Sequence, residues 1–192
     1  MDNRIIKALG QADHELASML AFIEVETGGK GFDTKTGKIL IQFEPSWFRK
    51  KAPYAPSGKW SVNRVDVQAK EWEAFNNAFK LNPTAAMEST SIGLAQIMGF
   101  HYKRLGYASV GKMWDDAKTG IEAQVRQLVK FIDTDAGLAD ALRKHDWARV
   151  ARLYNGAGYK AIARKYMRVP YDEAMRNTYI KYRKESENDK ED

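Results

Sequence analysis

The chain has 192 residues, of which 44% are hydrophobic and 29% charged, and it contains no cysteine. This length and composition fit one globular domain with its own core and room for a small sub-lobe, and they exclude disulfide bonds and cysteine metal sites. The net charge of +6 is uneven: residues 184–192 carry a net −3, which leaves +9 on residues 1–183. A basic body favours a polyanionic partner such as nucleic acid, a membrane surface or an anionic cell wall.

The first predicted element is a helix that Asp13 caps and that runs to about Thr27, where Gly28 and Gly29 end it. No apolar run precedes this helix, and no later window is apolar enough to span a bilayer. We therefore expect neither a secretory signal nor a membrane anchor, and no stable membrane insertion.

A short β element and a series of helices follow. Residues 38–43, KILIQF, come after the turn DTKTGK and predict a small β-hairpin near residues 33–44. The Pro- and Gly-containing residues 50–62 predict a loop. Apolar residues at helical spacing then predict helices over residues 65–80, 121–132, 138–142, 147–154 and 171–182. The expected fold is mainly α, a helical bundle with a small β-hairpin.

The end of the chain is a charged run. Residues 184–192, KESENDKED, hold five acids and two lysines and predict a disordered tail. We therefore expect a single domain over residues 1–183, and we expect the protein to be a monomer. The three histidines, His14, His101 and His145, are far apart and show no ligand spacing, so we expect no metal and no cofactor.

Two glutamates lie in the last turn of the first predicted helix, where the helix dipole disfavours negative charge. At about 100° per residue, Glu26 falls between Met19 and Phe22 inside the apolar arc, whereas Glu24 falls on the opposite margin and is expected to be solvated. A buried carboxyl group in this position has a raised pKa, which suits a general acid. The same position also suits a structural glutamate bonded to a nearby arginine or a backbone amide.

Several motifs extend this interpretation. The helix end VETGG is followed by ESTSIGLAQIMG over residues 88–99 and ARLYNG over residues 151–156. These resemble the E-[ST]-G, S-x-G-x-x-Q-I-M and A-x-x-Y-N-G motifs of goose-type lysozymes and lytic transglycosylases. ILIQFEPSWF, the block over residues 146–156 and the terminal helix resemble the phage endolysin N-acetylmuramidases more closely. The resemblance covers residues 10–182 and implies a lysozyme-like α+β fold.

The resemblance also implies residue roles. Glu26 would be the general acid, and Ser91, Gln96, Tyr154 and Asn155 would bind and orient the substrate. We expect Ser91 to cap a helix that carries Gln96. The hydroxyl of Tyr154, in a turn after the preceding helix, is expected to reach Glu26 or the substrate's N-acetyl group, although an N-G turn by itself is common in any protein.

The sequence does not decide which residue supplies a second catalytic carboxylate. Glu44 follows the apolar run and is carried by the resemblance, so it ranks above Asp33, which lies in a hydrophilic turn. Glu44 fits a purely structural role, as a buried residue that stabilises the fold, as well as it fits a catalytic one. Neither spacing fixes a distance between carboxyl groups, so a retaining or inverting outcome cannot be read. Among the aromatic residues, Trp47 and Trp60 are candidates for the substrate cleft. The aromatic residues at helical spacing are expected in the core, and these are Trp72, Phe75, Phe79 and Trp147.

The resemblance implies a peptidoglycan-degrading endolysin that hydrolyses the β-1,4 bond between N-acetylmuramic acid and N-acetylglucosamine. A lytic transglycosylase, which forms 1,6-anhydro ends with the same acid, is the alternative that these motifs do not separate. A catalytically inactive wall-binding module is a third. Charge alone also permits nucleic-acid binding, but no helix-turn-helix pattern supports it and we expect no such partner. The protein is expected in the host cytoplasm, reaching the wall after membrane permeabilisation.

Overall fold

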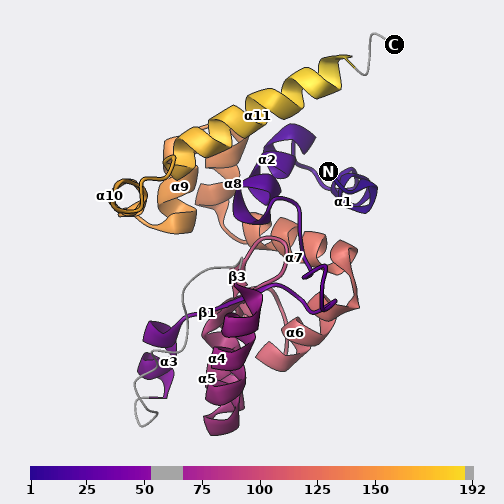
Figure 1. Cartoon of the computed structure of the whole chain (residues 1–192). Helices are drawn as coiled ribbons and strands as arrows, with labels where there is room; N and C mark the ends of the chain where they lie inside the picture. The colour runs from indigo at the N-terminus through magenta and orange to yellow at the C-terminus, as the bar shows by residue number, and fades with distance from the viewer. Residues whose placement is uncertain (53–66, 189–192) are drawn as a thin grey trace. The chain divides into compact units, whose positions relative to one another are not determined.

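The computed structural model describes residues 1–52 and 67–188 (Figure 1). Within these residues the chain forms eleven α-helices, one 3-10 helix and a three-stranded antiparallel sheet, so the expected mainly α fold is confirmed. The backbone divides into two compact units, which we call unit 1, residues 1–29 and 129–192, and unit 2, residues 30–128. The expectation of one catalytic domain stays a prediction. Most of the predicted loop over residues 50–62, including Trp60, lies outside the described residues.

Unit 1 is helical. It holds α1 (Asn3–Leu9), α2 (Leu16–Thr27), α8 (Ala136–Arg143), α9 (Trp147–Asn155), α10 (Tyr159–Lys165) and α11 (Tyr171–Asn188). The long helix α11 lies along α2 and α9, and α9 also packs on α8 (Figure 1). Helix α2 is buried along most of its length, including Met19, Phe22 and Ile23, so its last turn is held on a packed element.

The two ends of α2 differ from each other in how they are capped. Gly28 ends the helix in the left-handed conformation, with φ 62°, as the sequence predicts. The predicted cap at Asp13 is wrong, because the helix begins after Glu15, whose side chain makes no capping hydrogen bond. The Glu15 carboxylate instead accepts hydrogen bonds from Arg183 and Tyr179 of α11 and lies within 2.6 Å of His145 Nε2. Tertiary partners have replaced the local cap.

Helix α11 is longer than predicted. It continues to Asn188, so residues 184–188 are helical, and the expectation that they belong to a disordered tail is wrong. Arg183 and Glu187 pair at 3.0 Å one turn apart, and Ser186 Oγ donates to the Arg183 carbonyl. Such pairs support the last turns of a solvated helix that composition alone assigns to coil. Residues 189–192 lie outside the described residues.

Unit 2 holds the sheet and the remaining helices. Its elements are β1 (Ile41–Phe43), α3 (Pro45–Lys51), α4 (Gln68–Leu81), α5 (Pro83–Glu88), β2 (Thr90–Ile92), β3 (Ile97–Met98), η1 (Gly99–His101), α6 (Val110–Thr119) and most of α7 (Ile121–Asp133). The division between the units falls inside α7, after Leu128.

The sheet has the order β1-β2-β3, with Gln42 opposite Ser91 and Ser91 opposite Met98. The segment predicted as a helix carrying Gln96 is therefore a β-hairpin, and that prediction is wrong. Gly93 at φ 70° and Gln96 at φ 48° are both left-handed, which no right-handed helix contains.

The predicted β element near residues 33–44 is present, with a different partner. Asp33 N–H donates to the Lys38 carbonyl across the turn, and Phe32 forms an isolated bridge with Ile39. Strand β1 then pairs with the distant β2 rather than within this hairpin.

Two buried side chains of α4 form hydrogen bonds with the backbone groups on the other edge of β1. Gln68 bonds both the N–H and the carbonyl of Ile41, and the Glu71 carboxylate accepts from Phe43 N–H.

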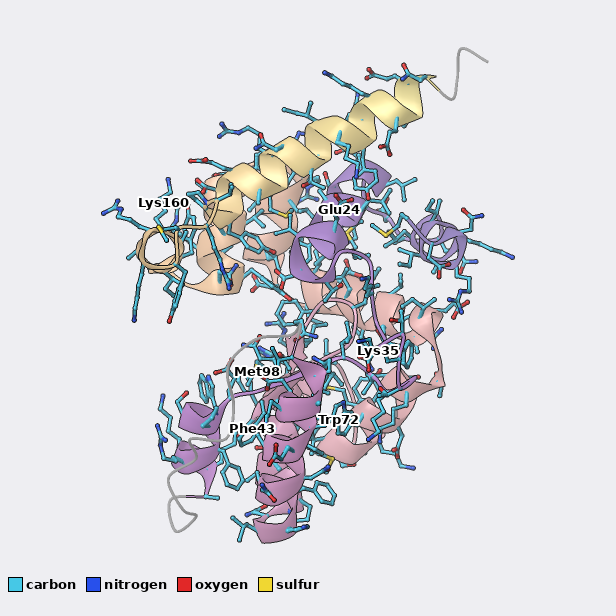
Figure 2. All side chains as sticks on the ribbon, viewed as in Figure 1. Glu24, Lys35, Phe43, Trp72, Met98 and Lys160 are labelled. Atoms are coloured by element: carbon cyan, nitrogen blue, oxygen red, sulfur yellow. The ribbon has the colours of Figure 1, made fainter. Side chains whose placement is uncertain are left out.

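Helix α4, on which Figure 2 labels Trp72, carries three aromatic residues that form a cluster with Trp114. Phe75 stacks on the buried Trp114 at 4.8 Å between ring centroids, and Trp72 meets both rings edge-on. The expected core position of Phe75 is confirmed, and Trp72 is only partly buried. Phe79 is 38% exposed, so its predicted core position is wrong: it lies at the margin of the cluster, beyond Phe75. In unit 1, Trp147 is buried as expected.

Candidate active site

Glu26 lies in the last turn of α2 and is partly buried in unit 1. The hydroxyl of Tyr171, the first residue of α11, donates a hydrogen bond of 2.5 Å to its Oε1. The Oε2 atom makes no hydrogen bond to any described residue. The carboxyl group thus has one oxygen held by a phenol and one oxygen left for another partner.

The rings of Tyr154 and Tyr171 lie next to this carboxyl group and belong to an aromatic cluster. Tyr154 meets Phe22 edge-on at 4.5 Å and Phe131 edge-on at 5.6 Å, and it stacks against Tyr171 at 6.2 Å. Burial raises the pKa of Glu26 to about 7, while the hydrogen bond from Tyr171 opposes the rise by stabilising the ionised form. Near neutral pH a substantial fraction of Glu26 therefore carries a proton.

Tyr154 and Asn155 lie close to the predicted place, in a different conformation. Both belong to the last turn of α9 rather than to a turn after it, and Gly156 follows at φ 86°. Burial, and then the charge of Glu26, raise the pKa of Tyr154, so its hydroxyl stays protonated beside that carboxyl group. Asn155 is exposed.

Tyr171 is the residue that sequence reasoning missed. The predicted terminal helix begins with it, but no pattern within one helix shows that its hydroxyl reaches a carboxylate 145 positions earlier in the chain. The available signal was its place as the opening residue of a helix already included in the family resemblance. Burial and Glu26 raise the pKa of Tyr171, which keeps it a hydrogen-bond donor at neutral pH.

The neighbouring Glu24 has the opposite environment (Figure 2). Lys181 Nζ lies 3.0 Å from its carboxylate, and Tyr182 donates a second hydrogen bond. Although partial burial opposes them, these partners lower the pKa of Glu24. Glu24 is therefore an ion-paired carboxylate rather than a freely solvated one, and of the two glutamates only Glu26 has a raised pKa.

In unit 2 the predicted polar residues form one connected network. Ser91 Oγ donates to Gln96 Oε1 at 3.0 Å, and Gln96 Nε2 donates to the Gly93 carbonyl at 2.8 Å. Ser91 and Gln96 are thus hydrogen-bonded across a hairpin, and Ser91 does not cap a helix. Gln96 holds a left-handed conformation that disfavours side chains, a form of strain that often accompanies functional sites.

The buried Gln124 of α7 forms a hydrogen bond with the backbone of this hairpin. Its Oε1 accepts from Leu94 N–H at 2.8 Å, and its Nε2 donates to the Ala117 carbonyl. A Cβ atom on Gly93 would lie 2.8 Å from that Oε1, so the absence of a side chain at Gly93 allows the Gln124 side chain to lie against the hairpin.

Glu44 follows β1 directly and is the N-cap residue before α3. Gln42 Nε2 donates to its Oε1 at 2.7 Å, and Gln42 in turn lies opposite Ser91 in the sheet. Partial burial raises the pKa of Glu44, and the nearby Glu71 adds to the rise. Asp33 differs, since its carboxylate accepts a 2.6 Å hydrogen bond from Thr36 within its own turn, which lowers its pKa.

Trp47 is the remaining candidate residue from the sequence that the structure describes. Trp47 is 39% exposed and lies against Phe100 at 4.8 Å, with Lys50 Nζ 4.6 Å from the ring centroid. Among residues 1–52 and 67–188, no group of three or more His, Asp or Glu side chains is placed to hold a metal ion. No helix in these ranges combines the length and apolarity that a membrane span requires.

The fold and the partly protonated carboxyl group at a helix end define the class of protein as lysozyme-like. A crystal structure of the Burkholderia AP3 phage endolysin has the same fold, with a TM-score of 0.75 and 29% sequence identity over 97% of this chain and 71% of that one. The N-acetylmuramidase family matches residues 15–183, and the chain belongs to this family. It is therefore a peptidoglycan-degrading muramidase, and the resemblance found in its motifs is confirmed. No curated protein matches the chain significantly.

Proposed function

We propose that this muramidase hydrolyses the β-1,4 bond between N-acetylmuramic acid and N-acetylglucosamine, with Glu26 as its general acid. The observation that carries the proposal is the carboxyl group of Glu26, which is partly buried at a helix C-terminus and has a pKa of about 7. A general acid is most effective when its pKa lies near the working pH, because it is then protonated and still gives up its proton readily.

Tyr171 would decide which oxygen of Glu26 delivers the proton. Its hydroxyl occupies Oε1, and a carboxylic acid that accepts at one oxygen carries its proton on the other. The proton on Oε2 would pass to the glycosidic oxygen as the bond to the sugar breaks and positive charge develops on the ring. Tyr171 is thus proposed as a positioning residue, and Tyr154 and Asn155 as substrate-binding residues of unit 1.

The hairpin of unit 2 would bind the substrate through Ser91 and Gln96, whose amide and hydroxyl groups suit the acetamido and hydroxyl groups of the glycan. Glu44 is proposed as the second carboxylate. Its raised pKa makes it a stronger base than an exposed glutamate, which suits activation of water. Asp33 is the weaker candidate because its carboxylate is committed to a turn. The substrate's own acetamido group is the alternative to both.

A role in phage lysis is part of the proposal. It rests on the similarity to a phage endolysin and on the +9 charge of residues 1–183, which would concentrate the enzyme at an anionic wall. The accumulation of the protein in the host cytoplasm, and its arrival at the wall after permeabilisation, stay predictions.

The test is digestion of purified peptidoglycan, followed by mass spectrometry of the released muropeptides. We expect the wild type to release fragments with reducing N-acetylmuramic acid ends, and Glu26→Gln to release almost none. Glu24→Gln is the matched control, two residues away on the same helix, and we expect it to retain most of the activity. Anhydro ends would instead identify a lytic transglycosylase, and undiminished release by Glu26→Gln would show that another residue is the acid.

A further inference from the structure

One surface of unit 1 combines exposed apolar residues with unopposed positive charge. Residues 147–171 contain six arginines and lysines and no acidic residue. Within this stretch, helix α10 and the loop after it expose Ile162 (57%), Tyr166 (56%), Met167 (95%) and Val169 (61%). These four residues, together with Arg164, Lys165 and Arg168, form what we call the α10 surface.

The helix that carries this surface is anchored to unit 1. Tyr159 and Ala163 are buried on one side of α10, which packs on α9 and α11 (Figure 1). Ile162 and Tyr166 lie four residues apart, so they share a face of the helix. Ile162 thus lies on a packed helix and Tyr166 at its C-terminal end, while Met167 and Val169 follow in the loop after it.

Met167 occupies a costly conformation. It follows α10 at φ 49°, and its N–H bonds to the Arg164 carbonyl while Arg168 N–H reaches back to the Ala163 carbonyl. This is the helix ending in which glycine is usual, because other side chains are strained there. The chain instead holds a methionine that is almost fully exposed. Strain and an exposed apolar side chain at one position indicate a binding role rather than a folding role.

The basic side chains of the surface are available to an anionic partner. Arg164, Lys165 and Arg168 make no ion pair with any described side chain, whereas Lys160 at the start of the helix pairs with Asp172 at 3.2 Å. Lys165 and Arg168 lie over the Tyr166 ring, 5.4 and 5.7 Å from its centroid. An exposed aromatic ring flanked by cations is typical of side chains that lie at a lipid headgroup layer.

We propose that the α10 surface docks on an anionic lipid bilayer. The aliphatic side chains of Ile162, Met167 and Val169 suit acyl chains, whereas a glycan strand offers no apolar layer that would receive them. A second copy of the chain would bring two basic surfaces together and be repelled. Binding of this kind is peripheral, since the apolar area is small and the charges supply the rest. It would hold the enzyme beside the wall that it degrades.

The test is sedimentation of the full chain with phosphatidylglycerol vesicles, compared with phosphatidylcholine vesicles and with purified peptidoglycan. We expect binding to the anionic vesicles that weakens with salt. The variant R164Q/K165Q/R168Q should weaken it by roughly fivefold for each side chain. Met167→Gly should weaken it by roughly tenfold or more, because it removes an inserting apolar side chain. Glycine suits the left-handed position, so this variant should fold at least as well as the wild type.

The control variants separate this surface from charge in general. K7Q/K112Q/K130Q removes three exposed lysines that make no ion pair with any described residue, and it should weaken vesicle binding much less. Glu26→Gln should bind vesicles like the wild type, so this test does not depend on catalysis. No binding to anionic vesicles, or equal loss in both triple variants, would overturn the proposal. So would variants of the α10 surface that lose affinity for peptidoglycan while they retain vesicle binding.

Discussion

Tyr171 Oη lies 2.5 Å from Glu26 Oε1 and joins the first residue of α11 to the last turn of α2. Two opposed effects act on the Glu26 carboxyl group: burial raises its pKa, and this hydrogen bond lowers it. The balance between them leaves the pKa at about 7. The proton affinity of the proposed acid is therefore a property of two helices, not of α2 alone.

The first prediction concerns the pH dependence of activity. A general acid works in its protonated form, so kcat/KM for peptidoglycan should fall as pH rises through about 7. Tyr171→Phe removes the bond that favours the ionised form, so the pKa of Glu26 rises. The alkaline limb of the profile should then move upward by about one to two pH units, since a hydrogen bond to a charged group contributes about 1.5–3 kcal/mol.

The control for this experiment is Tyr182→Phe, which removes the corresponding hydroxyl from Glu24. Its pH profile should keep the wild-type alkaline limb. If Tyr171→Phe lowered the rate at every pH without moving the limb, Tyr171 would have a structural role only.

The second prediction is that Glu26 destabilises the folded protein at high pH. Its pKa is 4.5 in the unfolded reference and about 7 when folded, so the folded state retains a proton that the unfolded state has lost. The penalty is absent below pH 4.5, grows between 4.5 and 7 and is complete above 7. At pH 8, Glu26→Gln should therefore raise the free energy of unfolding by at most about 3 kcal/mol.

Thermal unfolding of wild type and Glu26→Gln at pH 4 and pH 8 measures this effect. The Tm difference should be near zero at pH 4 and several degrees at pH 8, since each kcal/mol shifts Tm by about 2–4 °C in a chain of this size. A variant that is less stable than the wild type at pH 8 would contradict a raised pKa in the folded state.

The third prediction separates the two candidates for the second carboxylate. Glu44→Gln should lower kcat by about 10²–10⁴, the usual contribution of a group that transfers a proton. Asp33→Asn should change kcat by less than about twofold, because Asp33 serves a surface turn. Turnover of a soluble glycan fragment measures both. A large loss in Asp33→Asn and none in Glu44→Gln would transfer the role to Asp33. If both variants kept their activity, the substrate's acetamido group would be favoured instead.

The fourth prediction concerns the hairpin that carries Gln96. Gly93→Ala places a Cβ atom 2.8 Å from the buried Gln124 Oε1, at φ 70°, so both overlap and backbone strain oppose it. It should lower the free energy of unfolding by about 2–4 kcal/mol. Gly28→Ala is the matched control: its φ is 62°, nothing lies within 4 Å of the added Cβ, and it should cost only about 1 kcal/mol. Equal losses in urea titrations would mean that Gln124 moves aside freely.

The sequence predicted the helices with regular apolar spacing well, and the sheet less well. The helices over residues 121–132, 138–142 and 147–154 are present to within two residues at each end. The GLAQIMG segment was assigned to a helix because it is apolar, and short apolar runs do not distinguish a helix from a hairpin. The hairpin forms because Gln124, thirty residues beyond Leu94, supplies the acceptor for its backbone N–H.

By itself, the sequence determined the family and the mainly α fold, and it led to the proposal of Glu26 rather than Glu24 as the acid. Motif order, apolar periodicity and the direction of a side chain on a helix are local properties that one chain displays. Only the tertiary structure decided that Tyr171 holds Glu26, that Glu24 is neutralised by α11, and that Ser91 meets Gln96 across a hairpin. Those relationships depend on contacts between residues far apart in the chain or on left-handed turns. The pKa that makes Glu26 useful follows from the same contacts, because burial is a property of the packed molecule.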